Sequence, residues 1–231
     1  MLSKFPKKIR IVKKFFDNSN FNFEGKEILD IGGTNDYCEI LRSIFKPGKV
    51  YLLNYDKSQL QGVENSFVQD ATNLQFEDKS WDIITSFDVI EHLNNPDDLL
   101  SESYRVLKDE GLFIISSPNL ADCFSRITFL FGYIPFFYTP CQHRVGTPFN
   151  KKGPIMYHKS VFTCKAFEEL LKIHNFSIIQ SFGFSYTDEF YLDLDPSKKN
   201  RQTAYKFRKK LDKIMPKDLS EGFLYICKKI N

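Results

Sequence analysis

The sequence predicts a doubly wound α/β fold built on a mostly parallel sheet, and three observations support this. Stretches with strand and helix character alternate along residues 26–117. The predicted strands are apolar runs without period-two alternation, as expected for strands buried on both faces of a parallel sheet. Residues 26–36 read Lys-Glu-Ile-Leu-Asp-Ile-Gly-Gly-Thr-Asn-Asp, which indicates a strand, a tight glycine turn and the start of a helix.

The first predicted elements cover the amino-terminal half of the chain. An amphipathic helix at residues 7–16, within a cap segment 1–23, precedes the glycine turn. It covers a sheet edge or the mouth of a site, with membrane contact as the alternative. Further helices are expected at 37–45 and 96–107, and further strands at 49–54, 66–69, 81–86 and 111–117. A proline near the first turn favours the helix at 96–107.

The regular pattern lapses at residues 118–159, which we interpret as an inserted lid. Prolines at 135, 140, 148 and 154 interrupt this segment, and it holds nine aromatic residues: Phe124, Phe129, Phe131, Tyr133, Phe136, Phe137, Tyr138, Phe149 and Tyr157. A helix capped by Thr163 then runs to residue 174, with strands at 176–182 and 222–230. Between these strands, an insertion at 186–220 contains a basic helix at 197–215.

Composition limits the classes of protein that fit. The chain has 231 residues, 42% hydrophobic and 26% charged, so one domain spanning residues 1–231 can bury a full core. A net charge of +3 is too small to indicate a surface built for nucleic acid. The basic amino terminus lacks the apolar core of a signal peptide, and no stretch reaches the length of a spanning helix.

The five cysteines indicate a reducing compartment. They are scattered at positions 38, 123, 141, 164 and 227, which favours neither a disulfide framework nor a zinc knuckle. We therefore expect free thiols in the cytoplasm. The set of Cys141, His143, His158 and Cys164 lacks an ordered metal-ligand spacing, so no metal is predicted.

Acidic residues follow the first four predicted strands, at Asp30, Asp56, Asp70 and Asp88. Ligands of doubly wound sheets bind outside the carboxyl ends of the strands. Asp56 lies a little over twenty residues beyond the glycines, where a carboxylate can accept both hydrogen bonds of a ribose diol. Asp30 would repel a pyrophosphate at the helix start but would favour an amino group or a sulfonium. The alternative is that each acid is a helix cap or turn former.

The motifs that carry these acids resemble those of the class I S-adenosylmethionine-dependent methyltransferases. They are Ile-Leu-Asp-Ile-Gly-Gly (28–33), Tyr-Asp (55–56), Gln-Asp-Ala (69–71), Phe-Asp-Val-Ile-Glu-His-Leu (87–93) and Arg-Val-Leu-Lys-Asp-Glu-Gly (105–111). The likeness is strong over residues 24–117 and is greatest to the small-molecule branch that includes ubiquinone-biosynthesis O-methyltransferases. It implies a seven-stranded sheet whose last strand is antiparallel.

The resemblance also implies roles for individual residues. Asp30 and Gly32 would border the methionine part of S-adenosylmethionine, and Asp56 would hold its ribose. Asp70 and Ala71 would contact the adenine. Ser86 and Phe87 would close the pocket beneath the sulfonium.

The glycine loop departs from the family pattern. Thr34 and Asp36 stand where the family has glycines, and Gly33 is a substitute neighbour of Gly32. The Thr34 hydroxyl could bond to the cofactor carboxylate or narrow the pocket. An inactive scaffold that no longer binds cofactor is therefore an alternative. An NAD-dependent oxidoreductase is disfavoured by Asp30 and by the missing Gly-x-Gly-x-x-Gly.

Methyl transfer depends mainly on holding donor and acceptor in line, and a base helps only when the acceptor must lose a proton. His92, beside Glu91, is a candidate base or substrate contact, or else a residue packed on the sheet. His143 and His158 are loop histidines that could reach the site or be solvated.

The lid suggests the acceptor. Its aromatic residues suit a small or lipid-like acceptor, although they could instead pack on one another. The basic helix is a solvated face or attracts a phosphorylated or membrane-surface substrate. We expect methylation at oxygen rather than at nitrogen or carbon.

Overall fold

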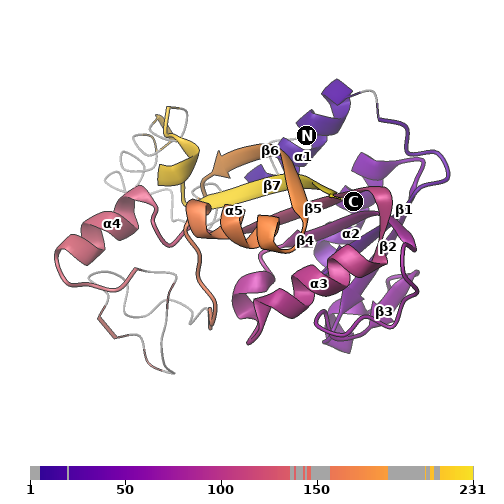
Figure 1. The fold of residues 1–231 in the computed structure, drawn as a ribbon, viewed down its shortest axis with the longest axis horizontal. Coiled ribbons are helices and arrows are strands. Elements are labelled where there is room, and N and C mark those ends of the chain that lie inside the picture. Colours follow the sequence, from indigo (N-terminus) through magenta and orange to yellow (C-terminus); the bar gives the residue numbers. More distant parts are fainter. Residues whose placement is uncertain are drawn as a thin grey trace, which may run out of the picture.

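An open seven-stranded sheet lies at the centre of the computed structural model, in the order β3-β2-β1-β4-β5-β7-β6 (Figure 1). The structure describes residues 6–19, 21–135, 138, 143, 145–146, 157–186, 206, 209–210 and 214–230. The strands are β1 (Glu27–Ile31), β2 (Lys49–Asn54), β3 (Ser66–Val68), β4 (Trp81–Phe87), β5 (Leu107–Pro118), β6 (Phe176–Phe184) and β7 (Gly222–Lys229). β3, β2, β1, β4 and β5 are parallel, whereas β7 pairs antiparallel with both β5 and β6.

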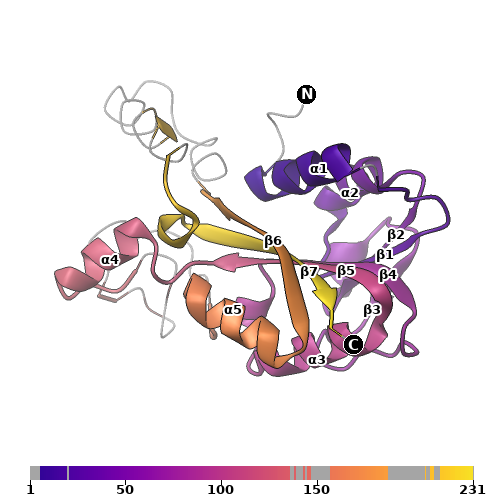
Figure 2. The same ribbon diagram turned by 45° about the horizontal axis from the view of Figure 1, so that its top comes forward.

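Helices cover both faces of this sheet. The described α-helices are α1 (Lys7–Ser19), α2 (Asn35–Phe45), α3 (Pro96–Val106), α4 (Cys123–Leu130) and α5 (Cys164–Ile173). Figure 2 shows α1 and α2 on one face and α3 and α5 on the other. Short 3₁₀ turns lie at η2 (Lys57–Leu60), η3 (Ile90–His92) and η4 (Lys217–Leu219). No helix among these residues is long and apolar enough to span a bilayer.

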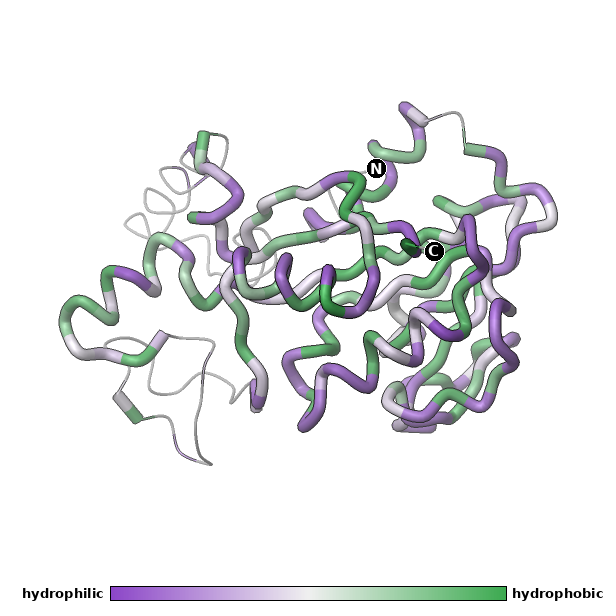
Figure 3. The backbone as a smooth tube through the Cα atoms, in the orientation of Figure 1, coloured by the Kyte–Doolittle hydropathy of each residue, from purple (hydrophilic) through white to green (hydrophobic). Residues whose placement is uncertain are grey.

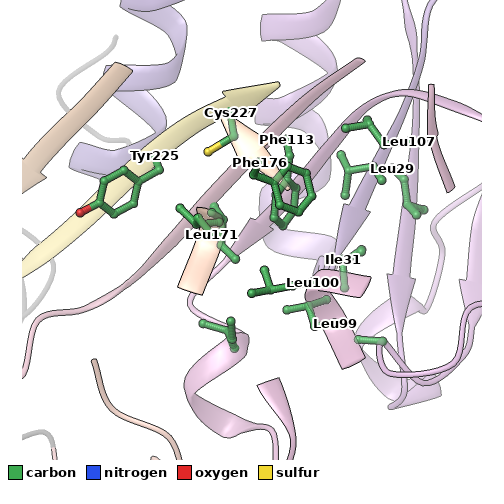
Figure 4. Close-up of a cluster of buried hydrophobic side chains, with 14 of the residues drawn as sticks. Leu29, Ile31, Leu99, Leu100, Leu107, Phe113, Leu171, Phe176, Tyr225 and Cys227 are labelled. Atoms are coloured by element: carbon green, nitrogen blue, oxygen red, sulfur yellow. The ribbon is translucent and has the colours of Figure 1, made fainter. Parts of the chain in front are cut away.

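Each face of the sheet has its own hydrophobic core. On the α1/α2 face, Val12 and Leu41 are fully buried against the sheet. On the other face, Leu100 of α3 and Leu171 of α5 point toward Phe113 and other buried strand residues (Figure 4). Burial of each such side chain stabilises the folded state by about 1.5–3 kcal/mol, so a sheet with both faces exposed to water would not be stable. This two-sided burial explains why the strand sequences do not alternate.

The strand order reverses between β1 and β4, which are neighbours in the sheet. After β1 the chain winds outward through β2 to β3, and after β4 it winds the other way to β5. The loops that follow β1 and β4 therefore diverge at the carboxyl edge of the sheet. This is the position at which doubly wound sheets bind ligands.

The predicted fold class is confirmed, including the seven-stranded sheet and its antiparallel last strand. Thr163 caps α5, its hydroxyl accepting a 3.2 Å hydrogen bond from the backbone N–H of Ala166. Two predictions were wrong. β5 begins at Leu107 rather than at residue 111, because α3 runs directly into it. Residues 118–159 are not wholly irregular, since Asp122 caps α4 through hydrogen bonds from the N–H groups of Phe124 and Ser125.

The two predicted insertions are described only in part. In both views α4 extends away from the sheet (Figures 1 and 2), and its tube is largely apolar in Figure 3. Half of the remaining lid, including residues 147–156, and most of the basic helix at 197–215 lie outside the described residues. The lid and the basic helix stay predictions.

Candidate active site

The turn after β1 requires glycine at both of its central positions. Gly32 has φ +80°, and a Cβ atom there would lie 2.2 Å from Cγ2 of Val89. A Cβ on Gly33 would lie 2.6 Å from Oδ2 of Asp30 and 2.9 Å from Cγ of Leu52. The Gly32 N–H donates to the carbonyl of Leu53 at 2.7 Å. These contacts hold the turn tightly over the ends of β1 and β2.

Asp30 lies beneath the turn, in the interior of β1. Its side chain is buried, and the Thr85 hydroxyl donates to Oδ1 at 2.5 Å. Burial raises the pKa of this carboxyl to about 7, although the Thr85 hydrogen bond and the charge of Lys8 oppose the rise. Asp30 can thus support the glycine turn as an acid or face a cation as a carboxylate.

A cavity of about 210 Å³ opens at this edge of the sheet. The residues that line it come from α1, the glycine turn, α2 and the end of β4: Lys8, Ile9, Asp30, Ile31, Gly32, Gly33, Thr34, Tyr37, Phe87 and Asp88. The predicted methionine-end residues therefore face one cavity. Thr34 stands at the N-cap of α2 without making a side-chain capping bond.

The sequence interpretation missed Lys8, which closes one side of the cavity. Its ammonium forms an ion pair with Asp88 and lies 5.7 Å from the ring centroid of Tyr186. Asp88 also accepts a 2.6 Å hydrogen bond from the Ser116 hydroxyl. Burial opposes ionisation of Asp88, but Lys8 holds its pKa below the usual value. Lys8 lies four residues before Val12 on the buried face of α1, and this spacing was the available signal.

The acids after β2 and β3 are more exposed than Asp30. Asp56 accepts a hydrogen bond from the N–H of Ser58 at 2.9 Å, and hydrogen bonds from Ser58 lower its pKa. Asp70 accepts from the N–H and the hydroxyl of Thr72 at 2.9 and 2.8 Å, which lowers its pKa. Both acids are thus turn formers and also stay ionised at neutral pH. They follow neighbouring parallel strands, so the structure brings them to the same edge as Asp30.

The remaining predicted cofactor residues lie close to the core. Ala71 is 9% exposed, directly after Asp70. Ser86 is buried near the end of β4, and no described residue forms a hydrogen bond with its Oγ. Phe87 is half-buried and lines the cavity.

Neither of the two predicted catalytic histidines is among the described residues that line the cavity. His92 lies in η3, just beyond Asp88, and its ring packs edge-to-face on His158 with centroids 4.8 Å apart. Burial lowers the pKa of His92 and lowers that of His158 to about 4, so both rings are neutral at pH 7. His143 is exposed, and it is not among the described residues that line the cavity.

Glu91 adds a buried acid to this histidine pair. Burial, together with the charge of Asp88, raises the pKa of its carboxyl well above the usual value. The Ser117 hydroxyl donates to Oε2 at a long 3.3 Å. The site therefore has a polar extension next to the cavity, made by η3, the end of β5 and the segment before α5.

Residues 4–181 match the family model described as "Methyltransferase domain". The chain belongs to this methyltransferase family. S-adenosylmethionine is the cosubstrate that the family and the fold imply for the enzyme. The residues around the glycine turn fit this cosubstrate: Gly32 and Gly33 leave room for a ligand to approach the backbone, and Asp56 presents an accessible carboxylate that could accept hydrogen bonds from a ribose.

Curated relatives of this methyltransferase support the assignment. It is 26% identical to a "Probable S-adenosylmethionine-dependent methyltransferase" of Mycolicibacterium smegmatis over 69% of this chain and 55% of that protein. It is 27% identical to a protein of the same description from Mycobacterium tuberculosis, over 45% of this chain and 38% of that protein. The methyltransferase thus spans about half the length, or less, of these relatives.

Solved structures share the fold. A SAM-dependent methyltransferase from Archaeoglobus fulgidus superposes with a TM-score of 0.59 at 18% identity, over 96% of this chain and 94% of that one. The [4+2]-cyclase SpnF also gives a TM-score of 0.59, at 12% identity, over 96% of this chain and 81% of that one. Fold alone therefore does not decide which reaction the methyltransferase catalyses.

Proposed function

We propose that the chain transfers the methyl group of S-adenosylmethionine to an oxygen atom of a small or lipid-like acceptor. This would group it with the small-molecule branch resembling ubiquinone-biosynthesis O-methyltransferases, acting in the cytoplasm. The observation that carries the proposal is the cavity at the strand-order reversal, which Asp30, the glycine turn and Phe87 line together.

The cavity suits the methionine end of the cosubstrate. The positive φ of Gly32 and the close packing of Gly33 keep side chains away from the turn, so a ligand can approach the backbone. Asp30, Asp88 and Lys8 all line this cavity, and Lys8 forms an ion pair with Asp88. An ionised Asp30 would favour the ammonium and sulfonium of the cosubstrate, while Lys8 would favour its carboxylate.

The exposed acids suit the nucleoside end. Asp56 is ionised and accessible next to the glycine turn, so it can accept hydrogen bonds from both ribose hydroxyls. Asp70 and Ala71 would contact the adenine, and Ser86 and Phe87 would lie beneath the sulfonium. With donor and acceptor aligned, the acceptor oxygen forms a bond to the methyl carbon, and the electron pair of the broken C–S bond goes to sulfur.

Two features favour an apolar acceptor with a hydroxyl group. Large side chains of α4 and the turn after it are exposed: Phe124, Ile127, Phe129, Leu130, Phe131 and Tyr133. Such a surface favours lipid-like molecules or contact with a membrane surface. The neutral imidazoles of His92 and His158 can accept a hydroxyl proton or hold a group that does so.

The proposal is tested with methyl-labelled S-adenosylmethionine and cell metabolites separated into lipid and water-soluble fractions. We expect label in an organic-phase product that remains uncharged at low pH, as an O-methyl ether or ester would. The Asp56→Ala variant should give little product at limiting cosubstrate. Label found only in products that become cationic in acid would contradict oxygen as the acceptor. Absence of both product and cosubstrate binding would favour the inactive scaffold.

A further inference from the structure

Three potential metal ligands converge beside the cavity, although they come from separate segments of the chain. One donor atom each of Glu91, His92 and His158 lies within 4.8 Å of the others. We propose that these residues bind a divalent transition-metal cation. The sequence predicted no metal, because His158 was considered with His143 and two cysteines, whereas Glu91 and His92 were considered apart from it as a possible base.

The buried carboxylate is the observation that points to a ligand. Glu91 is only 1% exposed, and among the described residues no group donates a hydrogen bond to its Oε1 atom. Its other oxygen receives the long hydrogen bond from Ser117. Buried carboxylate oxygens without partners are costly, so they are found where a cation or a proton compensates them. Oε1 is therefore available to a cation held by the two imidazoles.

The backbone holds the two segments of the proposed site together. The N–H groups of Lys159 and Ser160 both donate to the carbonyl of Glu91, at 2.7 and 3.0 Å. The Ser160 hydroxyl also donates to the carbonyl of Leu93 at 3.1 Å. His158 is thereby fixed against η3 by hydrogen bonds on its carboxyl-terminal side. This fixation lowers the conformational cost of assembling a site from distant residues.

The orientation of His92 suits ligation. Its ring donates a hydrogen bond to the backbone carbonyl of Tyr157. A ligating histidine commonly donates its second N–H in this way, which fixes the tautomer. The other ring nitrogen of His92 is then an acceptor.

The donor set selects the type of cation. Two imidazoles and one carboxylate suit Zn²⁺, Fe²⁺, Co²⁺ or Mn²⁺ and leave coordination positions open, whereas Mg²⁺ and Ca²⁺ prefer oxygen ligands. Tetrahedral donors around zinc are about 3.4 Å apart, so the three side chains would close by about an ångström on binding. Rotation of the partly exposed His92 ring could provide this movement.

The open positions suggest a role that rests on the proposed function. A cation next to the cavity could hold the acceptor hydroxyl and lower its pKa, so that the hydroxyl proton passes to solvent water before the oxygen takes the methyl group. This would restrict acceptors to molecules whose hydroxyl can reach the cation. His92 would then be a ligand rather than a free base.

The test is a titration of the folded, EDTA-treated and dialysed full chain with Co²⁺, followed by visible absorption, and with Zn²⁺, followed by calorimetry. We expect one equivalent of each ion to bind, with a Co²⁺ spectrum that lacks a thiolate charge-transfer band. Loss of a ligand should cost at least as much as loss of an outer-shell partner, so His92→Ala and His158→Ala should each weaken binding by at least about 10- to 100-fold. His92 is the more exposed of the two, so its variant should fold even if His158→Ala does not.

His174→Ala is the matched control, because His174 also contacts a carboxylate, at 2.8 Å from Asp97, but lies at the end of α5. It should bind the ions like the wild type. Equal binding in all variants, a thiolate band, or no binding by the folded wild type would overturn the metal site. Calorimetry with S-adenosylmethionine in EDTA separates the two proposals. Cosubstrate binding without metal binding removes only the metal site, and the reverse result removes the proposed function.

Discussion

Replacement of Gly32 by alanine tests whether the glycine turn is as tightly packed as the structure shows. The left-handed backbone conformation costs a non-glycine residue about 1–2 kcal/mol. The new Cβ would also lie 2.2 Å from Cγ2 of Val89, and overpacking of this kind costs about 1–3 kcal/mol. Together these predict a loss of about 2–5 kcal/mol in the free energy of unfolding, measured by urea denaturation followed by circular dichroism.

Two further variants isolate the clash. Gly25 has φ +69° with no atom within 4 Å of the position that a Cβ would take, so Gly25→Ala should lose only the conformational cost of about 1–2 kcal/mol. Val89→Ala removes the atom at 2.2 Å and leaves Cβ of Val89 at 3.5 Å, an ordinary contact. In a double-mutant cycle it should recover about 1–3 kcal/mol of the Gly32→Ala loss. Equal losses at Gly25 and Gly32, with no recovery, would refute the packing argument.

Three other predictions follow from the same contacts. Asp56→Ala should weaken S-adenosylmethionine binding about 10- to 100-fold in calorimetry, because hydrogen bonds to a charged group are lost; unchanged affinity would remove the ribose assignment. Asp30 keeps its proton up to about pH 7 in the folded chain but only up to about pH 3.8 in the unfolded chain. The free energy of unfolding therefore falls as pH rises between these two values. Asp30→Asn should therefore gain stability relative to wild type from pH 5 to pH 8, by up to about 3 kcal/mol, in urea denaturation; a pH-independent difference would contradict the raised pKa. Arg105→Lys should lower the free energy of unfolding by about 1–3 kcal/mol, because Arg105 donates hydrogen bonds to Glu102, Asp78 and two backbone carbonyls. Thermal melting measures the loss, and a melting temperature equal to that of the wild type would show that this network is dispensable.

The sequence predicted the sheet well because its signals are local. Continuous apolar runs marked the strands of the parallel sheet, and Gly32 marked a turn where a positive φ and close packing coincide. The acids at Asp56 and Asp70 were also predictable, because strand order places the ends of neighbouring parallel strands at one edge. Element ends were less certain, as the direct passage from α3 into β5 shows.

Contacts between distant segments could not be predicted in the same way. Lys8 meets Asp88 across 80 positions of sequence, and nothing near either residue indicates the pair. His158 reaches Glu91 only because backbone hydrogen bonds join the segment before α5 to η3. The buried state of Asp30 likewise depends on Thr85 of the neighbouring strand, 55 positions away. Such relationships are set by packing in three dimensions, which a single sequence does not display.

The central claim is that the carboxyl edge of β1, β2 and β3 holds S-adenosylmethionine, and calorimetry tests it most directly. We predict saturable binding at one site per wild-type chain, weakened in Asp56→Ala. Asp109→Ala should bind like wild type, because Asp109 is a half-buried acid near the start of β5 that pairs with Lys79. No heat of binding at millimolar S-adenosylmethionine, or equal loss of affinity in both variants, would contradict the account.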